Sequence, residues 1–359
     1  MRGLVSLALG AALLAGVATA SSGPGRVAPG ATMTAPRACH SATLLRTGRV
    51  LVAGGFRRED DYVLRAELYD PRRNRFLTTG TIREPRLCHT ATLLRDGRVL
   101  LAGGSTRNWL ASAELYDPKT GRFAATGRMA VARGAASATL LRDGRVLVIG
   151  GFDGGTHTTA ELYDPASGVF EPTGALGTAR SGHTATRLRD GRVLVTGGRG
   201  PSGAILRSAE IYDPASRTFA PAGRLTMPRH KHGAALLRSG DVLVIGGADS
   251  RDWRGRYRTT ELYDPDSSTF TPAARMGEAR FKLVDATAVL AGGRVLVAGG
   301  STSVETFDPL SRSFRAVAGR LDADRFYTTA TALPDGSALI AGGYGYDIQA
   351  TAKAWRYRP

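Results

Sequence analysis

Residues 89–104, HTATLLRDGRVLLAGG, decide the fold of this chain. Two β-prone runs flank the dipeptide Asp96-Gly97, and an Asp-Gly pair between two such runs is the strongest local signal for a tight β-hairpin. The second run ends in the diglycine Gly103-Gly104. The stretch therefore predicts two antiparallel strands joined by a two-residue turn, and it is one half of a longer repeating unit.

That unit recurs at intervals of 43 to 53 residues. Its diglycines are Gly54-Gly55, Gly103-Gly104, Gly150-Gly151, Gly197-Gly198, Gly246-Gly247, Gly299-Gly300 and Gly342-Gly343. After each diglycine except the last come a variable stretch, the sequence Glu-Leu-Tyr-Asp-Pro or a close variant, and a Phe five residues beyond the Pro. Each unit predicts four short strands and shows no helical period. Four-stranded units at this spacing indicate a β-propeller.

The two ends of the chain set the number of blades. The seventh unit stops just after its third strand, residues 355–357, and lacks a fourth. Near the start, residues 27–37 repeat the spacing of residues 123–133 in the second unit. We therefore expect residues 27–33 to form the outer strand of blade seven, which would leave no half-blade with an exposed edge. The prediction is an all-β, seven-bladed propeller closed by ordinary strand pairing.

Composition places the chain among folded globular proteins. Of its 359 residues, 42% are hydrophobic and 22% charged, which excludes a disordered chain. The net charge is +17 and arginine supplies nearly all of the cations. Because a GC-rich genome gives the same excess, we do not expect nucleic acid as a partner. Two cysteines are too few for a disulfide scaffold or a four-ligand zinc site.

The first twenty residues have the pattern of a secretory signal peptide. Arg2 precedes an apolar run, residues 4–17, that ends in Ala18-Thr19-Ala20. The run is shorter than the ~20 residues of a membrane-spanning helix, and no later segment approaches that length. We expect residues 1–20 to be removed and residues 21–359 to form a single propeller domain. The mature protein would be secreted or periplasmic, without a membrane span, and monomeric.

The diglycine, the Tyr and the aromatic residue that follows it are the marks of the kelch repeat. The chain resembles the kelch family over essentially its whole mature length. It is similar to bacterial kelch proteins and to the central propeller of galactose oxidase-like copper radical oxidases. Phe stands where many kelch repeats carry Trp, and either ring fills the gap between two blades.

One face of the predicted propeller carries the loops of variable length. The loops between second and third strands share this face with the connections between blades, and the Asp-Gly turns lie opposite. Variable loops on a rigid scaffold are a usual place for binding residues. An arginine opens each blade on this face: Arg37, Arg86, Arg133, Arg180, Arg229 and Arg325, with Arg280 or Lys282 in the sixth blade. These cations would either attract an anionic ligand or pair with the Glu of a neighbouring third strand.

Three residues after these arginines, four blades carry a histidine. These are His40, His89, His183 and His232, replaced elsewhere by Ala136, Asp285 and Thr328. The resemblance implies that such histidines bond to backbone between blades. As metal ligands they would have to converge at the channel mouth.

The resemblance gives the two cysteines a specific meaning. Cys39 and Cys88 stand at equivalent places in adjacent blades, where galactose oxidase-like enzymes carry a Cys and the copper-ligating Tyr cross-linked to it. It implies that the two side chains touch and, in an exported protein, form a disulfide. It also implies an alternative, a copper site of Tyr327, His40, His89 and Cys39. Against copper, the Cys–Tyr order is reversed, the Tyr-His pair is missing, and no added domain supplies the remaining His.

Aromatic residues and carboxylates stand together in the loops between second and third strands. We expect Trp109, Trp253, Tyr257 and Tyr344 to contact a ligand unless these rings pack onto the blades. Exposed rings beside carboxylates suit a sugar and a protein hot spot equally well. The sequence thus predicts an exported binding module, without a cofactor, that holds an acidic protein or glycan over the channel mouth. The alternatives are a copper-dependent oxidase and a structural or adhesion component, because the fold does not decide among them.

Overall fold

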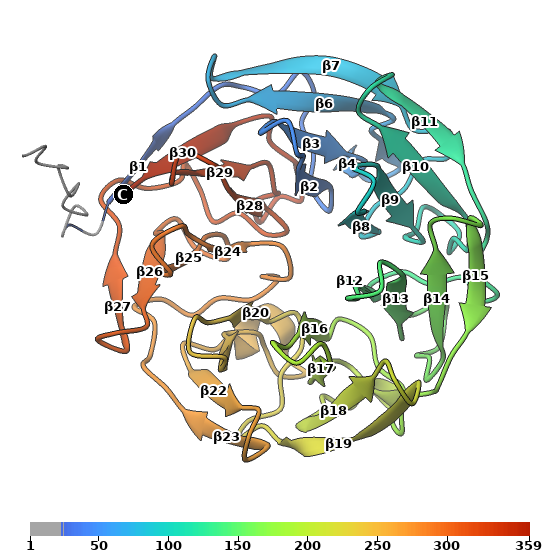
Figure 1. The fold of residues 1–359 in the computed structure, drawn as a ribbon. Helices are drawn as coiled ribbons and strands as arrows, with labels where there is room; N and C mark the ends of the chain where they lie inside the picture. Colours follow the sequence, from blue (N-terminus) through green and yellow to red (C-terminus); the bar gives the residue numbers. More distant parts are fainter. Residues whose placement is uncertain (1–22, 24) are drawn as a thin grey trace, which may run out of the picture.

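The computed structural model describes residue 23 and residues 25–359, so the predicted signal peptide lies outside the described residues. Seven four-stranded antiparallel sheets stand in a ring around a central channel, as the sequence predicted (Figure 1). Within the described part of the chain, no helix is long and apolar enough to cross a membrane.

Each blade is built outward from the channel. Blade one has strands β2 (Ser41–Leu44), β3 (Val50–Ala53), β6 (Arg65–Asp70) and β7 (Arg75–Thr81). Blade two has β8 (Thr90–Leu93), β9 (Val99–Ala102), β10 (Ala113–Asp117) and β11 (Arg122–Ala125). Blade three has β12 (Ser137–Leu140), β13 (Val146–Ile149), β14 (Ala160–Asp164) and β15 (Val169–Pro172). Blade four has β16 (Thr184–Arg187), β17 (Val193–Thr196), β18 (Ser208–Asp213) and β19 (Thr218–Arg224).

The remaining blades follow the same order. Blade five has β20 (Gly233–Leu236), β21 (Val242–Ile245), β22 (Thr260–Asp264) and β23 (Thr269–Pro272). Blade six has β24 (Thr287–Val289), β25 (Val295–Val297), β26 (Glu305–Asp308) and β27 (Ser313–Ala316). Blade seven has β28 (Thr329–Ala332), β29 (Ala338–Ala341), β30 (Ala354–Arg358) and β1 (Arg26–Pro29). The loops add a small hairpin, β4 (Phe56–Arg58) and β5 (Asp61–Tyr62), and two 3-10 turns, η1 (Pro201–Gly203) and η2 (Asp252–Gly255).

The ring closes as predicted, by pairing the start of the chain with its end. Val27 lies opposite Tyr357 and Pro29 opposite Trp355 in an antiparallel ladder. The regular strand ends at Pro29, and two further backbone bonds, from Gly30 and Met33, continue the contact in a looser register. Blade seven therefore has four strands drawn from both ends of the chain.

The Glu-Leu-Tyr-Asp-Pro motif explains how each blade holds its neighbour. In blade two, the ring of Tyr116 packs on Phe123 with 4.9 Å between ring centroids, and its hydroxyl bonds to Thr79 of blade one at 2.9 Å. Asp117 accepts a hydrogen bond from the backbone N–H of Lys119 at 2.8 Å and so forms the turn into the outer strand. The Tyr–Phe pair fills the gap between blades and the Asp fixes the turn.

The diglycine is required where the second strand leaves the sheet. Gly103 and Gly104 have φ angles of 64° and 96°, a region that side chains disfavour. A Cβ atom on Gly103 would lie 2.4 Å from the carbonyl oxygen of Arg133, and one on Gly104 would lie 2.7 Å from that of Leu87. The segments that open blades two and three therefore pack directly on this diglycine. This packing positions the backbone of residues 86–89 and 133 near the channel mouth.

Candidate functional site

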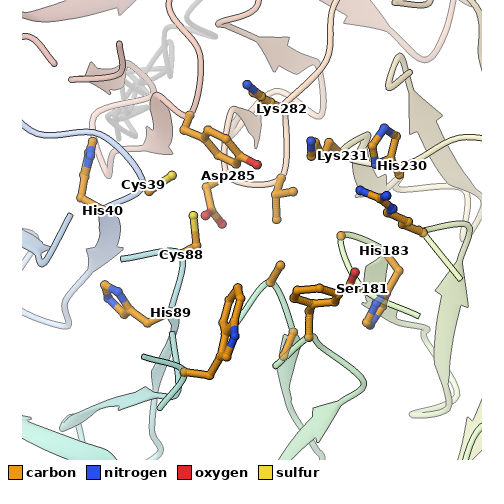
Figure 2. Close-up of a pocket in the computed structure, with 18 of the residues that line it drawn as sticks. Cys39, His40, Cys88, His89, Ser181, His183, His230, Lys231, Lys282 and Asp285 are labelled. Carbon is orange, nitrogen blue, oxygen red and sulfur yellow. The ribbon is translucent and has the colours of Figure 1, made fainter. Parts of the chain in front are cut away.

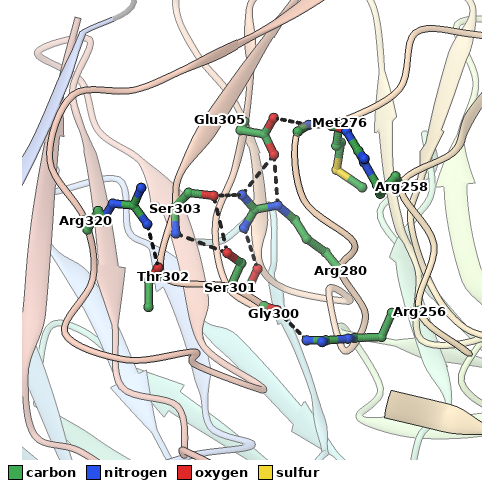
Figure 3. Close-up of polar contacts among 12 residues, drawn as sticks. Arg256, Arg258, Met276, Arg280, Gly300, Ser301, Thr302, Ser303, Glu305 and Arg320 are labelled. Atoms are coloured by element: carbon green, nitrogen blue, oxygen red, sulfur yellow. Dashed lines mark hydrogen bonds and ion pairs between the residues drawn. The ribbon is translucent and has the colours of Figure 1, made fainter. Parts of the chain in front are cut away.

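Buried ion pairs hold the arginine that opens each blade. Arg133 donates to Glu161 at 2.6 Å and to the carbonyl oxygens of Gly150 and Thr159 at 2.7 and 3.0 Å. Its side chain has no exposed surface, and burial lowers its pKa while Glu161 opposes the shift. Five further pairs repeat this geometry: Arg37–Glu67, Arg86–Glu114, Arg180–Glu210, Arg229–Glu261 and Arg280–Glu305. Figure 3 shows the pair in blade six.

These pairs place the predicted arginine set inside the scaffold. The alternative of pairing with third-strand glutamates is confirmed, and the sixth blade uses Arg280 and not Lys282. Arg325 differs because Trp355 occupies the position of the Glu in blade seven, and Arg325 bonds instead to Asp322 at 2.7 Å. Since the six paired side chains are fully buried, their guanidinium groups do not reach the channel surface.

The four histidines also serve the contacts between blades. The Nε2 atoms of His89 and His183 lie 3.0 and 2.8 Å from the hydroxyls of Ser41 and Ser137, each in the preceding blade. Burial lowers the pKa of both imidazoles to about 3, which keeps them neutral. His40 and His232 make equivalent bonds to Thr329 and to Thr184.

The sixth blade departs from the expected histidine position. A Cβ atom on Gly150 would lie 3.0 Å from the ring of His183, and one on Gly246 would lie 3.1 Å from Leu283. Leu283 therefore takes the histidine position, and the expectation that Asp285 fills it was wrong. Blade six has a small insertion between Leu283 and strand β24, after the histidine position and not before it. Asp285 belongs to this insertion and lies at the channel.

Seven residues, each two positions after an opening arginine, form what we call the mouth ring. Its members are Cys39, Cys88, Ala135, Gly182, Lys231, Lys282 and Tyr327, and all have φ between 48° and 59°. Backbone hydrogen bonds link neighbours, such as Cys88 N–H to Cys39 O at 2.9 Å and Lys231 N–H to Gly182 O at 2.8 Å. The shared left-handed backbone turns the six side chains of this ring toward one axis, and Gly182 leaves the seventh position open.

The mouth ring borders a cavity of about 340 Å³ at the entrance to the channel. This volume is in the range of small-ligand sites. Figure 2 shows the cysteines on one side and the lysines on another. The apolar part of the lining comes from Cys39, Cys88, Trp109, Phe152 and Tyr327, and the basic part from Arg199, His230, Lys231 and Lys282.

Lys282 is a cation without a carboxylate partner in the described structure. Its Nζ lies 4.9 to 5.4 Å from the centroids of Phe281, Phe326, Tyr327 and Tyr344, and it donates to the Tyr344 hydroxyl. Burial, with the charge of Lys231 nearby, lowers the pKa of Lys282. Four rings at this distance hold a cation by their electron-rich faces. The ammonium is therefore fixed in place at the cavity wall.

Two carboxylates complete the electrostatics of the mouth. Asp252 bonds to Lys231 at 3.0 Å, and contact with His230 and Lys231 lowers the pKa of its carboxyl. Asp285 is exposed to the channel space, and the protein that surrounds this space limits the hydration of its carboxylate and raises its pKa to about 6. Below that pH Asp285 can donate a hydrogen bond, and above it the carboxylate accepts.

Cys39 and Cys88 are free thiols that lie side by side (Figure 2). The predicted adjacency is thus present, while the disulfide is not formed in this structure. Burial is the main cause that raises the pKa of Cys39, with the thiol of Cys88 adding to it. Both side chains face the cavity and are therefore reachable from the channel mouth.

The alternative copper set is not brought together. Cys39 and Tyr327 face the cavity, but His40 and His89 direct Nε2 to hydroxyls between blades and lie away from the cysteines (Figure 2). Within residues 25–359 no cluster of three His, Cys, Asp or Glu side chains could hold a metal ion. The donor set therefore does not fit copper in this geometry.

Of the four loop aromatics predicted to contact a ligand, Trp109 alone is in the lining of the described cavity. It is 38% exposed and meets Phe152 edge-on, with 5.1 Å between ring centroids. Tyr344 is outside this lining but accepts a hydrogen bond from Lys282, which belongs to it. Trp253 packs on Tyr346 and carries Arg254 over its ring, while Tyr257 lies half-buried against Arg229. Lys231 and Asp285 were not predicted to line the site, although the shared offset from each opening arginine marks Lys231.

Comparison with known proteins identifies the type of propeller. No family model and no curated protein matches the chain. A solved structure of a fungal alcohol oxidase of the AA5 family, in complex with copper, matches with a TM-score of 0.76. The fold is a galactose oxidase-like propeller. The alignment covers 94% of this chain and 77% of that one at 19% identity, so the likeness concerns the fold alone.

Proposed function

We propose that this propeller is a binding module whose mouth cavity takes an acidic sugar residue of a glycan. The observation that carries the proposal is that one small cavity is lined both by Lys282, whose ammonium has no carboxylate partner among the described residues, and by the exposed ring of Trp109. A carboxylate would pair with Lys282, and the C–H face of the sugar would lie on the indole. Asp285 is available for a hydroxyl group.

The size of the cavity favours a single sugar unit over a protein surface. A stable protein interface buries roughly 800 Å² on each partner. The described cavity is instead a concave site of about 340 Å³ lined by both apolar and charged side chains, and this volume is in the range of small-ligand sites. A protein ligand would have to insert one acidic side chain and would gain less from Trp109.

The test is binding of uronic-acid oligosaccharides and their neutral counterparts by calorimetry. We expect selective binding of the acidic sugars, weakened about tenfold or more in both Lys282→Met and Trp109→Ala. Trp253→Ala and Lys353→Met are the matched controls, because these exposed side chains lie outside the cavity. Equal affinity for neutral sugars, or equal losses in the controls, would contradict the proposal.

We further propose that the mature protein is exported and that Cys39 and Cys88 can be oxidised to a disulfide. Adjacent thiols in neighbouring blades need only a small movement, and an oxidising compartment favours the bond. A thiol count on denatured protein from the periplasm is expected to give none, and two free thiols would reject the disulfide. Copper oxidation is not proposed, because the histidines it would use are held between blades.

A further inference from the structure

The face opposite the mouth carries a second basic feature. In five consecutive blades the second residue after the innermost strand is an exposed arginine: Arg46, Arg95, Arg142, Arg189 and Arg238. We call these residues the arginine arc. Strand β8 shows the geometry, because Cys88 of the mouth ring precedes it and Arg95 of the arc follows it. Since the innermost strands surround the channel (Figure 1), the turns that carry the arc in blades one to five lie along the rim of its other opening.

The arc is built as a chain of contacts from blade to blade. Each Nη2 donates to the backbone carbonyl at the same place in the next blade, as from Arg95 to Arg142 and from Arg142 to Arg189. The aliphatic part of Arg142 lies on the next turn, where a Cβ atom on Gly191 would be 3.0 Å from Arg142 Cδ. The five bonds end at Ala291 of blade six, and Pro334 occupies the position in blade seven.

No carboxylate neutralises these five arginines within the described structure. In three of these turns the acidic residue is paired with a different arginine, as Asp96–Arg98, Asp143–Arg145 and Asp190–Arg192 at 2.6 to 2.7 Å. In the turn after Arg238, Asp241 accepts a hydrogen bond from Ser239 instead. Each arc guanidinium uses one nitrogen for the carbonyl of the next blade and has no other partner. This bond fixes the planar guanidinium group, and the remaining N–H groups of the guanidinium face solvent.

We propose that the arginine arc binds a linear acidic polysaccharide. Its cations repeat once per blade, and a chain with a carboxylate or sulfate on each unit presents anions at a regular interval. A fixed guanidinium fork matches both groups. A small anion would meet only one or two members, so it would gain little from the array. The predicted export places the protein among extracellular glycans, which is why we assign this polyanion and not nucleic acid.

This inference is separate from the proposed function, because it concerns the opposite face and other residues. The experiment measures the affinity of the full mature chain for heparin and for alginate over a series of NaCl concentrations. The test variant is the triple substitution Arg95→Gln, Arg142→Gln and Arg189→Gln. We expect its affinity to fall about tenfold or more, with a weaker salt dependence because fewer counterions are released.

The control carries the same change in charge at other exposed arginines. Arg128, Arg224 and Arg275 stand on the outer strands or next to them, and none is in an ion pair of the described structure. Their triple substitution with Gln is expected to change affinity less than about twofold. Equal losses in both triples would overturn the proposal, since net charge alone would then explain binding. Tighter, arc-dependent binding of single-stranded DNA of equal charge would also overturn it.

Two further variants keep the outcome interpretable. Should the triple variant fail to fold, Arg142→Gln alone is expected to weaken binding measurably and Arg142→Lys to retain most of it; no loss in Arg142→Gln would overturn the proposal. Because heparin carries uronic acids that the proposed mouth site also takes, the arginine triple is compared in the natural chain and in the Lys282→Met background. We expect the same fold loss of heparin affinity on removing the arc in both backgrounds. A loss that disappears in the Lys282→Met background would overturn the arc as a separate site, whereas failure of the proposed function shows only in the short oligosaccharides and leaves the arc-dependent loss in place.

Discussion

Arg133 shows how one side chain can link the start of a blade to its second and third strands. Its guanidinium joins the start of blade three to the carbonyls after the second strand and to Glu161 on the third. Glu161 in turn accepts the backbone N–H of Ala130 at 2.8 Å. A buried charge is tolerated only when its partners are complete, so the value of this pair depends on keeping both members.

We therefore expect Arg133→Met to lower the free energy of unfolding by about 3–5 kcal/mol, because Glu161 is left buried and unpaired. The double variant Arg133→Met with Glu161→Leu should recover most of the loss. Arg98→Met, which breaks the exposed pair with Asp96, should cost less than about 1 kcal/mol. Denaturant unfolding measures all three, and equal losses at both sites would contradict the buried pair as the cause.

The buried histidines predict a dependence of stability on pH. Their pKa is lowered to about 3 in the folded protein at His89 and His183, from about 6.5 in the unfolded chain. The unfolded chain therefore binds more protons, and stability falls as pH decreases below about 6.5. Asp285, with its pKa raised to about 6, acts in the opposite direction between about pH 4 and 6.

His183→Leu isolates this effect, because blade six already has Leu283 at the same position. We expect the variant to lose less stability than the natural protein between pH 6.5 and about 4, by up to about 1.4 kcal/mol per pH unit for one histidine. The measurement is the unfolding midpoint as a function of pH. An unchanged acid slope would show that His183 is protonated in the folded state.

At the scale of the strand, ring closure depends on β1. Val27 is 2% exposed and packs in a cluster with Val317 and Tyr357, so it contacts both blade six and blade seven. Its N–H also bonds to Ala318 at 2.8 Å. A four-residue strand thus joins two blades and covers the edge of β30.

Val27→Ala is expected to lower the free energy of unfolding by about 2 kcal/mol, through lost burial and a small cavity. Arg26→Ala, on the same strand but exposed, should change it by less than about 0.5 kcal/mol. Urea unfolding of the mature chain compares the two. A loss at Val27 no larger than that at Arg26 would mean that β1 does not hold the ring closed.

For the whole molecule, the propeller separates two kinds of positive charge. The arginines that open the blades are paired and buried, whereas Lys282 at the mouth and the arginine arc at the opposite opening have no carboxylate partner within the described residues. Part of the net charge of +17 therefore reaches solvent at the two ends of the channel. These ends are where we place the two proposed ligands.

The sequence by itself determined the architecture, because that information is local and repeated. The Asp-Gly turn, the diglycine and the Glu-Leu-Tyr-Asp-Pro motif each act within one blade or on its neighbour, and the spacing of Val27 near the start completed the count of blades. The same repetition gave the arginine–glutamate pairs as one of two alternatives, and the resemblance to galactose oxidase-like enzymes implied that Cys39 and Cys88 are adjacent.

Only the tertiary structure decided which side chains face the channel. Whether Arg37 is exposed or paired depends on its distance to Glu67. Whether Lys282 replaces the opening arginine of blade six or is held beside aromatic rings depends on side chains from blades six and seven. The position of Asp285 in the channel depends on whether the insertion of blade six comes before or after the histidine position, and only the structure shows that it comes after. Convergence on an axis is a property of seven blades together, so no single repeat encodes the site.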